Sequence, residues 1–193
     1  MSDFSFYYLL GWRHIISINA LDHLLFLTVL AAGYSFMEWR QVLVLVTAFT
    51  IGHCITLVLS SSGTIKLAPG WVEFFIPCTI LLTAASRLRL NASSGSIPIR
   101  YIMAFFFGLI HGFGFANTLR FIITENEHFG WSLFGFNIGL ECGQVVFICL
   151  LLLIASFFIK FLKVKQSHWV ISISILVFCL ALKMAIERWP LHN

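Results

Sequence analysis

The chain has 193 residues, of which 60% are hydrophobic and only 10% are charged. Soluble domains carry about 25% charged residues, so this composition excludes an ordinary soluble protein and predicts a single integral membrane domain over residues 1–193. The net charge is only +4, and the sequence has neither a basic stripe nor a Gly-rich phosphate loop, which excludes nucleic acid and nucleotides as expected partners.

Six stretches of the chain approach the length of about 20 apolar residues that a membrane-spanning helix needs. They are residues 14–33, 42–61, 71–88, 99–120, 131–159 and 168–188. Residues 4–10 are too short to span and are expected in the membrane interface. The expected fold is an all-α, polytopic bundle of about six transmembrane helices in a lipid bilayer.

Basic residues in the short loops predict the orientation of the bundle, because cytoplasmic loops carry an excess of Lys and Arg. The loops after the first, third and fifth expected spans hold Arg40, Arg87, Arg89, Arg100, Lys160, Lys163 and Lys165. We therefore expect both termini on the outer side of a bacterial inner membrane. The first residues have no basic run and no small-residue cleavage site, so a removable signal peptide is not expected.

Ionisable and amide side chains interrupt the apolar spans. A charge at mid-bilayer costs about 2.5–3.5 kcal/mol, so such residues indicate a use. They are His14, Asp22, His23, His53, Glu73, His111, Asn137, Glu141, Gln144 and Glu187. In the expected orientation each lies between the midplane and the outer surface, which predicts one shared polar site in the outer half of the bundle.

The first two expected spans carry four of these residues, three of them in short motifs. Asp22 and His23 are adjacent, about 100° apart on a helix, and suit two metal ligands, or a ligand with the group that orients it. A hydrogen-bonded pair between helices would also explain them. His53 follows Gly52, which allows close helix approach, although a lone intramembrane histidine is often structural. Cys54 is a possible soft ligand, but packing is the preferred interpretation for it and for the other four single cysteines.

The later spans carry two denser patterns. His111 lies among Gly108, Gly112 and Gly114, and these glycines predict a loosened helix around it or close helix packing. Asn137, Glu141 and Gln144 follow i, i+4, i+7 spacing and predict one polar stripe. A separate ridge of small residues follows i, i+4, i+8 spacing at Gly135, Gly139 and Gly143. Near the last span's end, Lys183 and Glu187 are spaced to form an ion pair.

The combination of imidazole and carboxylate groups predicts a transition-metal site. Imidazole suits Ni²⁺, Co²⁺ or Zn²⁺, whereas sites for Mg²⁺ or Ca²⁺ are built from oxygen ligands. The predicted ligands are His14, Asp22, His23, His53, His111 and Glu141. The predicted supporting residues are Glu73, Asn117, Asn137 and Gln144.

Five ordered motifs give the chain a resemblance to a known family. They are LDHLLF at residues 21–26, FTIGHCIT at 49–56, WVEFFIP at 71–77, FGLIHGFGFA at 107–116 and FNIGLECGQ at 136–144. The sequence resembles the HupE/UreJ family of small bacterial membrane proteins over nearly its whole length. The resemblance implies uptake of nickel, and also of cobalt, for the maturation of hydrogenase and urease.

Three functions from different classes fit these observations. The first is a metal permease for nickel or cobalt. The second is an intramembrane zinc-dependent hydrolase acting on a lipid or another membrane-embedded substrate, with Glu141 or Asp22 as general base. The third is a structural or sensor protein with a bound metal. The sequence leaves open whether copies of the chain associate.

One feature of the sequence favours the hydrolase over the permease. Few polar residues continue from the expected site toward the cytoplasmic side, so no inward path for an ion is visible. The second expected span offers Thr47, and the third offers Thr79, Thr83 and Ser86.

Overall fold

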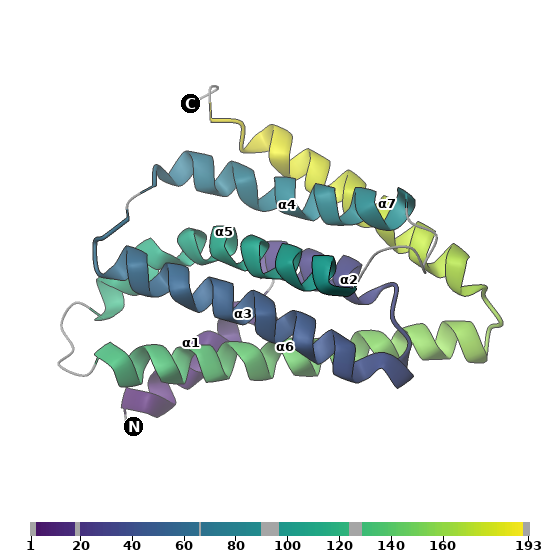
Figure 1. Cartoon of the computed structure of the whole chain (residues 1–193), viewed down its shortest axis with the longest axis horizontal. Coiled ribbons are helices and arrows are strands. Elements are labelled where there is room, and N and C mark those ends of the chain that lie inside the picture. The colour runs from purple at the N-terminus through teal and green to yellow at the C-terminus, as the bar shows by residue number, and fades with distance from the viewer. Residues whose placement is uncertain (1–2, 18–19, 66, 90–96, 124–128, 191–193) are drawn as a thin grey trace.

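The computed structural model describes residues 3–17, 20–65, 67–89, 97–123 and 129–190. These ranges contain α-helices and one short 3-10 helix, with no strand (Figure 1). In chain order they are α1 (Asp3–Ile16), α2 (Leu21–Ala31), η2 (Phe36–Glu38), α3 (Trp39–Ser61), α4 (Pro69–Arg89), α5 (Ile97–Ile123), α6 (Phe129–Lys160) and α7 (Gln166–Glu187). The predicted all-α fold is confirmed.

Five stretches of helix are long and apolar enough to cross a membrane. They are Phe36–Ser61, Pro69–Leu88, Ile99–Ala116, Gly130–Lys160 and Gln166–Glu187, and they coincide with the second to sixth predicted spans to within a few residues at most ends. A sixth span is formed if α1 and α2 are taken together. The chain is therefore a multi-pass membrane protein.

The first predicted span differs from the structure. One continuous helix over residues 14–33 is wrong, because α1 ends at Ile16 and α2 begins at Leu21, with the two helices inclined by 67°. Residues 4–10 belong to α1 and pack along α6, where Tyr7 is 2% exposed. Packing on α6 stabilises these residues as helix, and a search for long apolar runs cannot detect that contribution.

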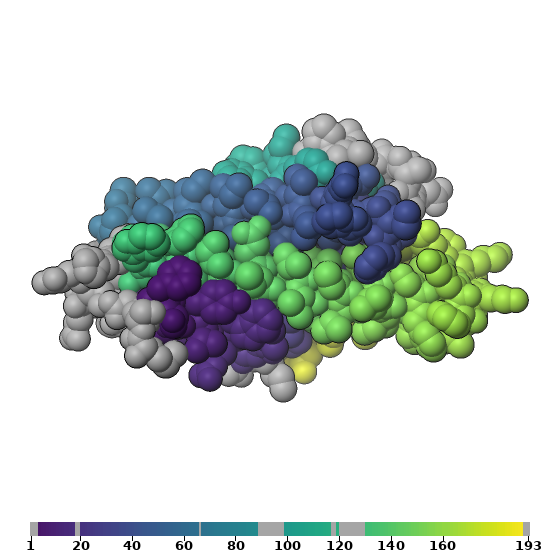
Figure 2. Space-filling model, turned by 90° about the horizontal axis from the view of Figure 1, so that it is seen from below, coloured from purple at the N-terminus to yellow at the C-terminus, as the bar shows by residue number. Residues whose placement is uncertain are grey.

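Glycines set the distance between two parallel pairs of helices. In the pair of α1 and α6, Gly135, Gly139 and Gly143 of α6 face Phe4, Tyr8 and Ile15 of α1 in order, so the two helices run in the same direction. The predicted ridge of small residues is confirmed by this packing. Figure 2 shows α1 at the surface of the bundle, lying against α6.

The second parallel pair joins α3 to α5. Gly52 of α3 faces the backbone of Phe105, while Gly108 and Gly112 of α5 face the backbone of Phe49 and His53. Small residues at such crossings let backbones approach closely. Helix α5 is continuous through Gly108, Gly112 and Gly114, so the prediction of a loosened helix is wrong and helix packing accounts for the first two of these glycines.

The third pair, α4 with α7, lies on one side of the bundle, and α2 runs between the pairs, in contact with α4, α6 and α7 (Figure 1). Arg87 of α4 fixes the end of α2 by donating a hydrogen bond of 2.7 Å from Nη2 to the Leu30 carbonyl. The last carbonyls of a helix lack intrahelical partners, so this contact both satisfies one of them and ties α2 to α4. Gly33 leaves room for the guanidinium, since a Cβ there would lie 2.6 Å from Arg87 Nη1.

Local signals also define the two ends of α3. Before the helix, the Ser35 backbone N–H donates to Glu38 Oε2 at 2.9 Å as part of a capping box. At its end, Gly63 takes a φ of 75°, and hydrogen bonds run from the Gly63 and Thr64 amides to the Ser60 and Leu59 carbonyls. This is the Schellman pattern, which requires a left-handed residue after the helix. Helix α3, which carries His53, therefore has both of its ends set by local hydrogen bonds.

Candidate metal centre

Four histidines from four different helices meet inside the bundle. His14 lies in the last turn of α1 and His23 in the first turn of α2, so both flank the bend between these helices. His53 belongs to α3 and His111 to α5, the two helices held together by their glycines. His53 and His111 are 0% exposed and His23 is 6% exposed, while His14 is half-buried.

The imidazole rings are close enough to share one ion. Ring centroids are 4.8 Å apart for His14 and His23, 5.8 Å for His23 and His53, and 6.2 Å for His14 and His53. One ring nitrogen from each of these three residues lies within 4.8 Å of the others. Two imidazole nitrogens on one ion are at most about 4.2 Å apart, twice a bond of 2.1 Å, so small side-chain rotations bring them to bonding distance.

The fourth histidine packs against this group. The His111 ring centroid lies 5.1 Å from that of His23, which is closer than His53 lies to His23. His111 therefore belongs to the same cluster, although its nitrogens lie outside the tightest group of three.

Several buried imidazole nitrogens of this cluster indicate what it can bind. Among the described residues, no hydrogen-bond partner is present for His14 Nε2, His23 Nε2, His111 Nδ1 or either nitrogen of His53. Buried polar atoms are almost always hydrogen-bonded, because an unsatisfied one costs about 1–3 kcal/mol. A neutral imidazole has its lone pair on one of its two nitrogens, so each of these four rings could offer one lone pair to a transition-metal ion.

Phenylalanine rings enclose the histidines. The Phe115 ring centroid is 4.1 Å from that of His14, and the ring centroids of Phe26 and Phe49 lie 5.4 and 5.2 Å from that of His111. Phe136 stacks on Phe115 at 5.1 Å and lies 6.5 Å from the His53 ring. The imidazoles therefore lie in largely apolar surroundings.

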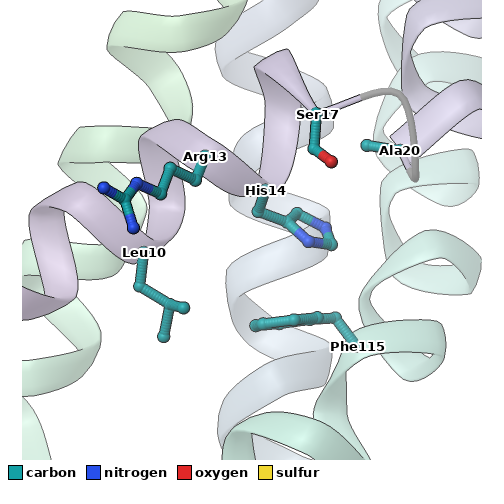
Figure 3. Close-up of a pocket in the computed structure, with 6 residues that line it drawn as sticks. All are labelled: Leu10, Arg13, His14, Ser17, Ala20 and Phe115. Carbon is teal, nitrogen blue, oxygen red and sulfur yellow. The ribbon is translucent and has the colours of Figure 1, made fainter.

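A pocket of about 230 Å³ reaches the cluster at His14. It is lined by Leu10, Arg13, His14, Ser17, Ala20 and Phe115. In Figure 3 the imidazole of His14 lies over the Phe115 ring, and the exposed Arg13 points to the opposite side of α1. The pocket lies at the bend between α1 and α2, so the bend provides access to a histidine ligand.

The predicted carboxylate ligands contact other groups. Both oxygens of Asp22 accept hydrogen bonds of 3.1 Å from Arg188 Nη1, which joins α2 to the end of α7. Glu141 accepts a hydrogen bond of 2.7 Å from Thr47 Oγ1. Neither is part of the described three-histidine group, and their role as ligands stays a prediction.

The predicted supporting residues are distributed over three helices. Gln144 is fully buried and accepts a hydrogen bond of 2.8 Å from Thr50, so Glu141 and Gln144 both face α3, as their spacing predicts. Asn137 donates to the Leu133 carbonyl of its own helix at 2.8 Å. Glu73 is exposed on the first turns of α4, and the Asn117 side chain lies outside the described part of the chain.

Near the end of α7, the predicted pair of Lys183 and Glu187 is confirmed at 3.7 Å on an exposed surface.

Sequence reasoning gave no role to Thr50, Thr79 or Arg188 at this centre. Thr50 and Thr79 are hydroxyl residues in apolar spans, where back-bonding to the helix is common, so nothing in their spacing distinguishes them. Arg188 follows the last span and pairs with a residue 166 positions earlier in the chain. No local pattern could have revealed that contact.

Comparison with protein-family models matches residues 1–188 to the family described as HupE / UreJ protein. This chain belongs to the HupE/UreJ family. Neither the comparison with curated proteins nor that with solved structures gave a match. The HupE/UreJ family is associated with the uptake of nickel and cobalt, and the four-histidine cluster is the part of this member that could hold such an ion.

Proposed function

We propose that this HupE/UreJ protein is a permease for Ni²⁺ or Co²⁺ in the bacterial inner membrane, and that His14, His23, His53 and His111 bind the ion on its way. The observation that carries the proposal is a cluster of four histidines with five buried imidazole nitrogens that have no hydrogen-bond partner in the described part of the chain. Imidazole nitrogen is a preferred ligand for both metals, and the family association points to the same ions.

The charge of the cluster supports transport rather than storage. The three grouped ligands are imidazoles, which bind a metal ion in their neutral form, whereas the carboxylate of Asp22 is paired with Arg188. A divalent cation in such a site keeps its full charge in an apolar surrounding, where charge is costly. The uncompensated charge weakens binding relative to a site that also contains a carboxylate ligand, which suits a site that must release its cargo.

Polar side chains on both sides of the cluster supply a route. On one side, the pocket at the bend reaches His14 (Figure 3). On the other, Thr50 and Thr47 lie one and two turns before His53 on α3 and are hydrogen-bonded to Gln144 and Glu141 of α6. In the orientation that the basic loops predict, this second set continues toward the cytoplasm. Of this set, only Thr47 is among the polar residues that the sequence predicts to continue inward, and the structure adds Thr50 with Gln144.

The membrane potential supplies a driving force in that orientation. Moving one charge through 100 mV is worth about 2.3 kcal/mol, so a divalent ion gains about 4.6 kcal/mol per 100 mV on moving inward. The sequence has no nucleotide-binding loop, and the proposal requires none.

The zinc-dependent hydrolase is the alternative, because three histidines with access from a pocket also describe a catalytic zinc site. Such an enzyme needs a base beside the metal-bound water. The two candidate bases, Asp22 and Glu141, are instead bonded to Arg188 and Thr47. These contacts favour the permease.

Uptake of radioactive Ni²⁺ into proteoliposomes with an imposed inside-negative potential tests the proposal. We expect accumulation with the wild-type protein, a loss of at least tenfold with His53→Ala, and no change with His168→Ala. His168 is an exposed histidine of α7 and serves as the matched control. Metal analysis of the purified protein accompanies the assay. Stoichiometric zinc that resists dialysis, without nickel or cobalt uptake, would support the hydrolase, and no binding of any of these metals would refute both functions.

A further inference from the structure

Thr79 of α4 contacts His111, whose Nδ1 has no hydrogen-bond partner among the described residues. Its Oγ1 lies 3.0 Å from His111 Nε2 and 2.7 Å from the carbonyl oxygen of Ile76. Thr79 is 3% exposed and His111 is 0% exposed, so the described surroundings leave water no access to this contact.

The direction of the hydrogen bond between Thr79 and His111 follows from the single proton that the threonine hydroxyl can donate. A carbonyl oxygen can only accept, and a threonine hydroxyl has a single proton to donate. At 2.7 Å the Ile76 carbonyl takes that proton. The hydroxyl oxygen then offers lone pairs to His111, and the neutral imidazole must donate from Nε2.

A neutral imidazole that carries its proton on Nε2 has its lone pair on Nδ1. His111 Nδ1 is a buried atom without a hydrogen-bond partner among the described residues, and its ring packs against His23 at 5.1 Å. The proton on Nε2 therefore points toward Thr79 of α4, and the lone pair on Nδ1 is left for a metal.

We infer that Thr79 is a positioning residue of the metal centre, which fixes His111 in its Nε2–H tautomer so that the ion is bound through Nδ1. The inference rests on the proposed metal-binding function for its consequence, but the tautomer is a property of the metal-free protein. Partners of this kind orient histidine ligands and raise their basicity in metal sites, and their loss costs about 10–100-fold in metal affinity.

Three variants of α4 separate positioning from helix stability. Thr79→Val removes the hydroxyl with little change in shape, and Thr79→Ser keeps a hydroxyl that can make both contacts. Thr83→Val is the matched control, since Thr83 is also buried, at 6% exposed, and its hydroxyl bonds back to the Thr79 carbonyl at 2.8 Å, a bond within α4 itself. Any general cost of losing a buried hydroxyl from this helix appears equally in Thr79→Val and Thr83→Val.

The first measurement is ¹⁵N NMR of histidine-labelled, metal-free protein in lipid bilayers, with His111 assigned from its loss in His111→Ala. The two ring nitrogens have widely separated shifts according to which one carries the proton. We expect the Nε2–H tautomer in wild type, Thr79→Ser and Thr83→Val, and loss of this single tautomer in Thr79→Val. An Nδ1–H tautomer in wild type, or an unchanged His111 in Thr79→Val, would overturn the inference.

The second measurement is titration of the same proteins with Ni²⁺ and Co²⁺. We expect affinity to fall about 10–100-fold in Thr79→Val and to stay at the wild-type level in Thr79→Ser and Thr83→Val. An equal loss in Thr79→Val and Thr83→Val would reduce Thr79 to a structural role and overturn the inference. A wild-type protein that binds neither metal would refute the proposed function, whereas the His111 tautomer would still decide whether Thr79 sets it.

Discussion

Gly112→Ala should spread the metal centre by forcing α3 and α5 apart. A Cβ at Gly112 would lie 2.5 Å from the His53 carbonyl oxygen and 2.9 Å from Thr56 Cβ. Reaching an ordinary contact of 3.4 Å requires a movement of about 0.9 Å, and because the nearest atom is backbone, no side-chain rotation can supply it. The movement separates His53 on α3 from His111, the neighbour of Gly112 on α5.

The histidine group tolerates little of this movement. Its nitrogens lie within 4.8 Å of one another, against about 4.2 Å for two nitrogens on one ion, so closing around a metal already requires a contraction of about 0.6 Å. If the whole movement reaches His53, the distance between His53 and His111 grows by about 0.9 Å, which exceeds this contraction. We expect nickel or cobalt affinity to fall at least tenfold, together with a loss of stability of about 1–3 kcal/mol from overpacking.

Calorimetric titration with Ni²⁺ and thermal unfolding in detergent measure the two effects of Gly112→Ala. Gly130→Ala is the control, because it makes the same chemical change in α6 at a position where the described residues place nothing within 4 Å of the new Cβ. Alanine is the better helix former by about 1 kcal/mol, so a clash that mattered little would leave Gly112→Ala at least as stable as wild type. Wild-type affinity and stability in this variant would refute the proposed coupling between helix spacing and ligand spacing.

Three further predictions concern an ion pair, a cysteine and the orientation of the chain in the membrane. Arg188→Gln should destabilise the protein by about 1–3 kcal/mol, because it leaves the Asp22 carboxylate, which is 17% exposed, without its partner. Lys183→Gln should have no measurable effect, since that ion pair is largely exposed; equal unfolding temperatures of the two variants would contradict this difference. Cys54→Ser should leave nickel affinity unchanged in titrations, because Cys54 is not part of the described three-histidine group, and a tenfold loss would identify it as a ligand. Alkaline phosphatase fused after residue 193 should be active in cells, since the basic loops predict an outer C-terminus; activity only in fusions to the loop at Lys160 would reverse the orientation.

Most of the fold could be predicted from the sequence, because a long apolar run by itself indicates a helix that spans the membrane. The second to sixth spans needed only length and hydrophobicity, since the bilayer fixes both. The break between α1 and α2 could not be predicted in this way. It depends on α1 packing along the glycine ridge of α6, and those glycines lie more than 120 residues later in the chain.

The candidate site was predictable in its histidines and less so in its carboxylates. His14, His23, His53 and His111 stand out because imidazoles are rare in apolar helices, and the structure brings all four together. Asp22 stands out equally, yet its carboxylate is paired with Arg188. A sequence shows that a polar group is buried but does not show which of several possible partners satisfies it.

The sequence by itself determined the chemical inventory, namely membrane helices, four intramembrane histidines and glycines that allow close packing. Hydrophobicity, ligand chemistry and the size of a side chain belong to single residues or to residues near one another in the chain. The tertiary structure alone decided which helix faces meet, and therefore that Glu141 bonds to Thr47 and that Thr79 engages one nitrogen of His111. These contacts join helices far apart in the chain. Their geometry depends on differences of a few tenths of an ångström in the distances between packed helices, and no local pattern in the sequence encodes such differences.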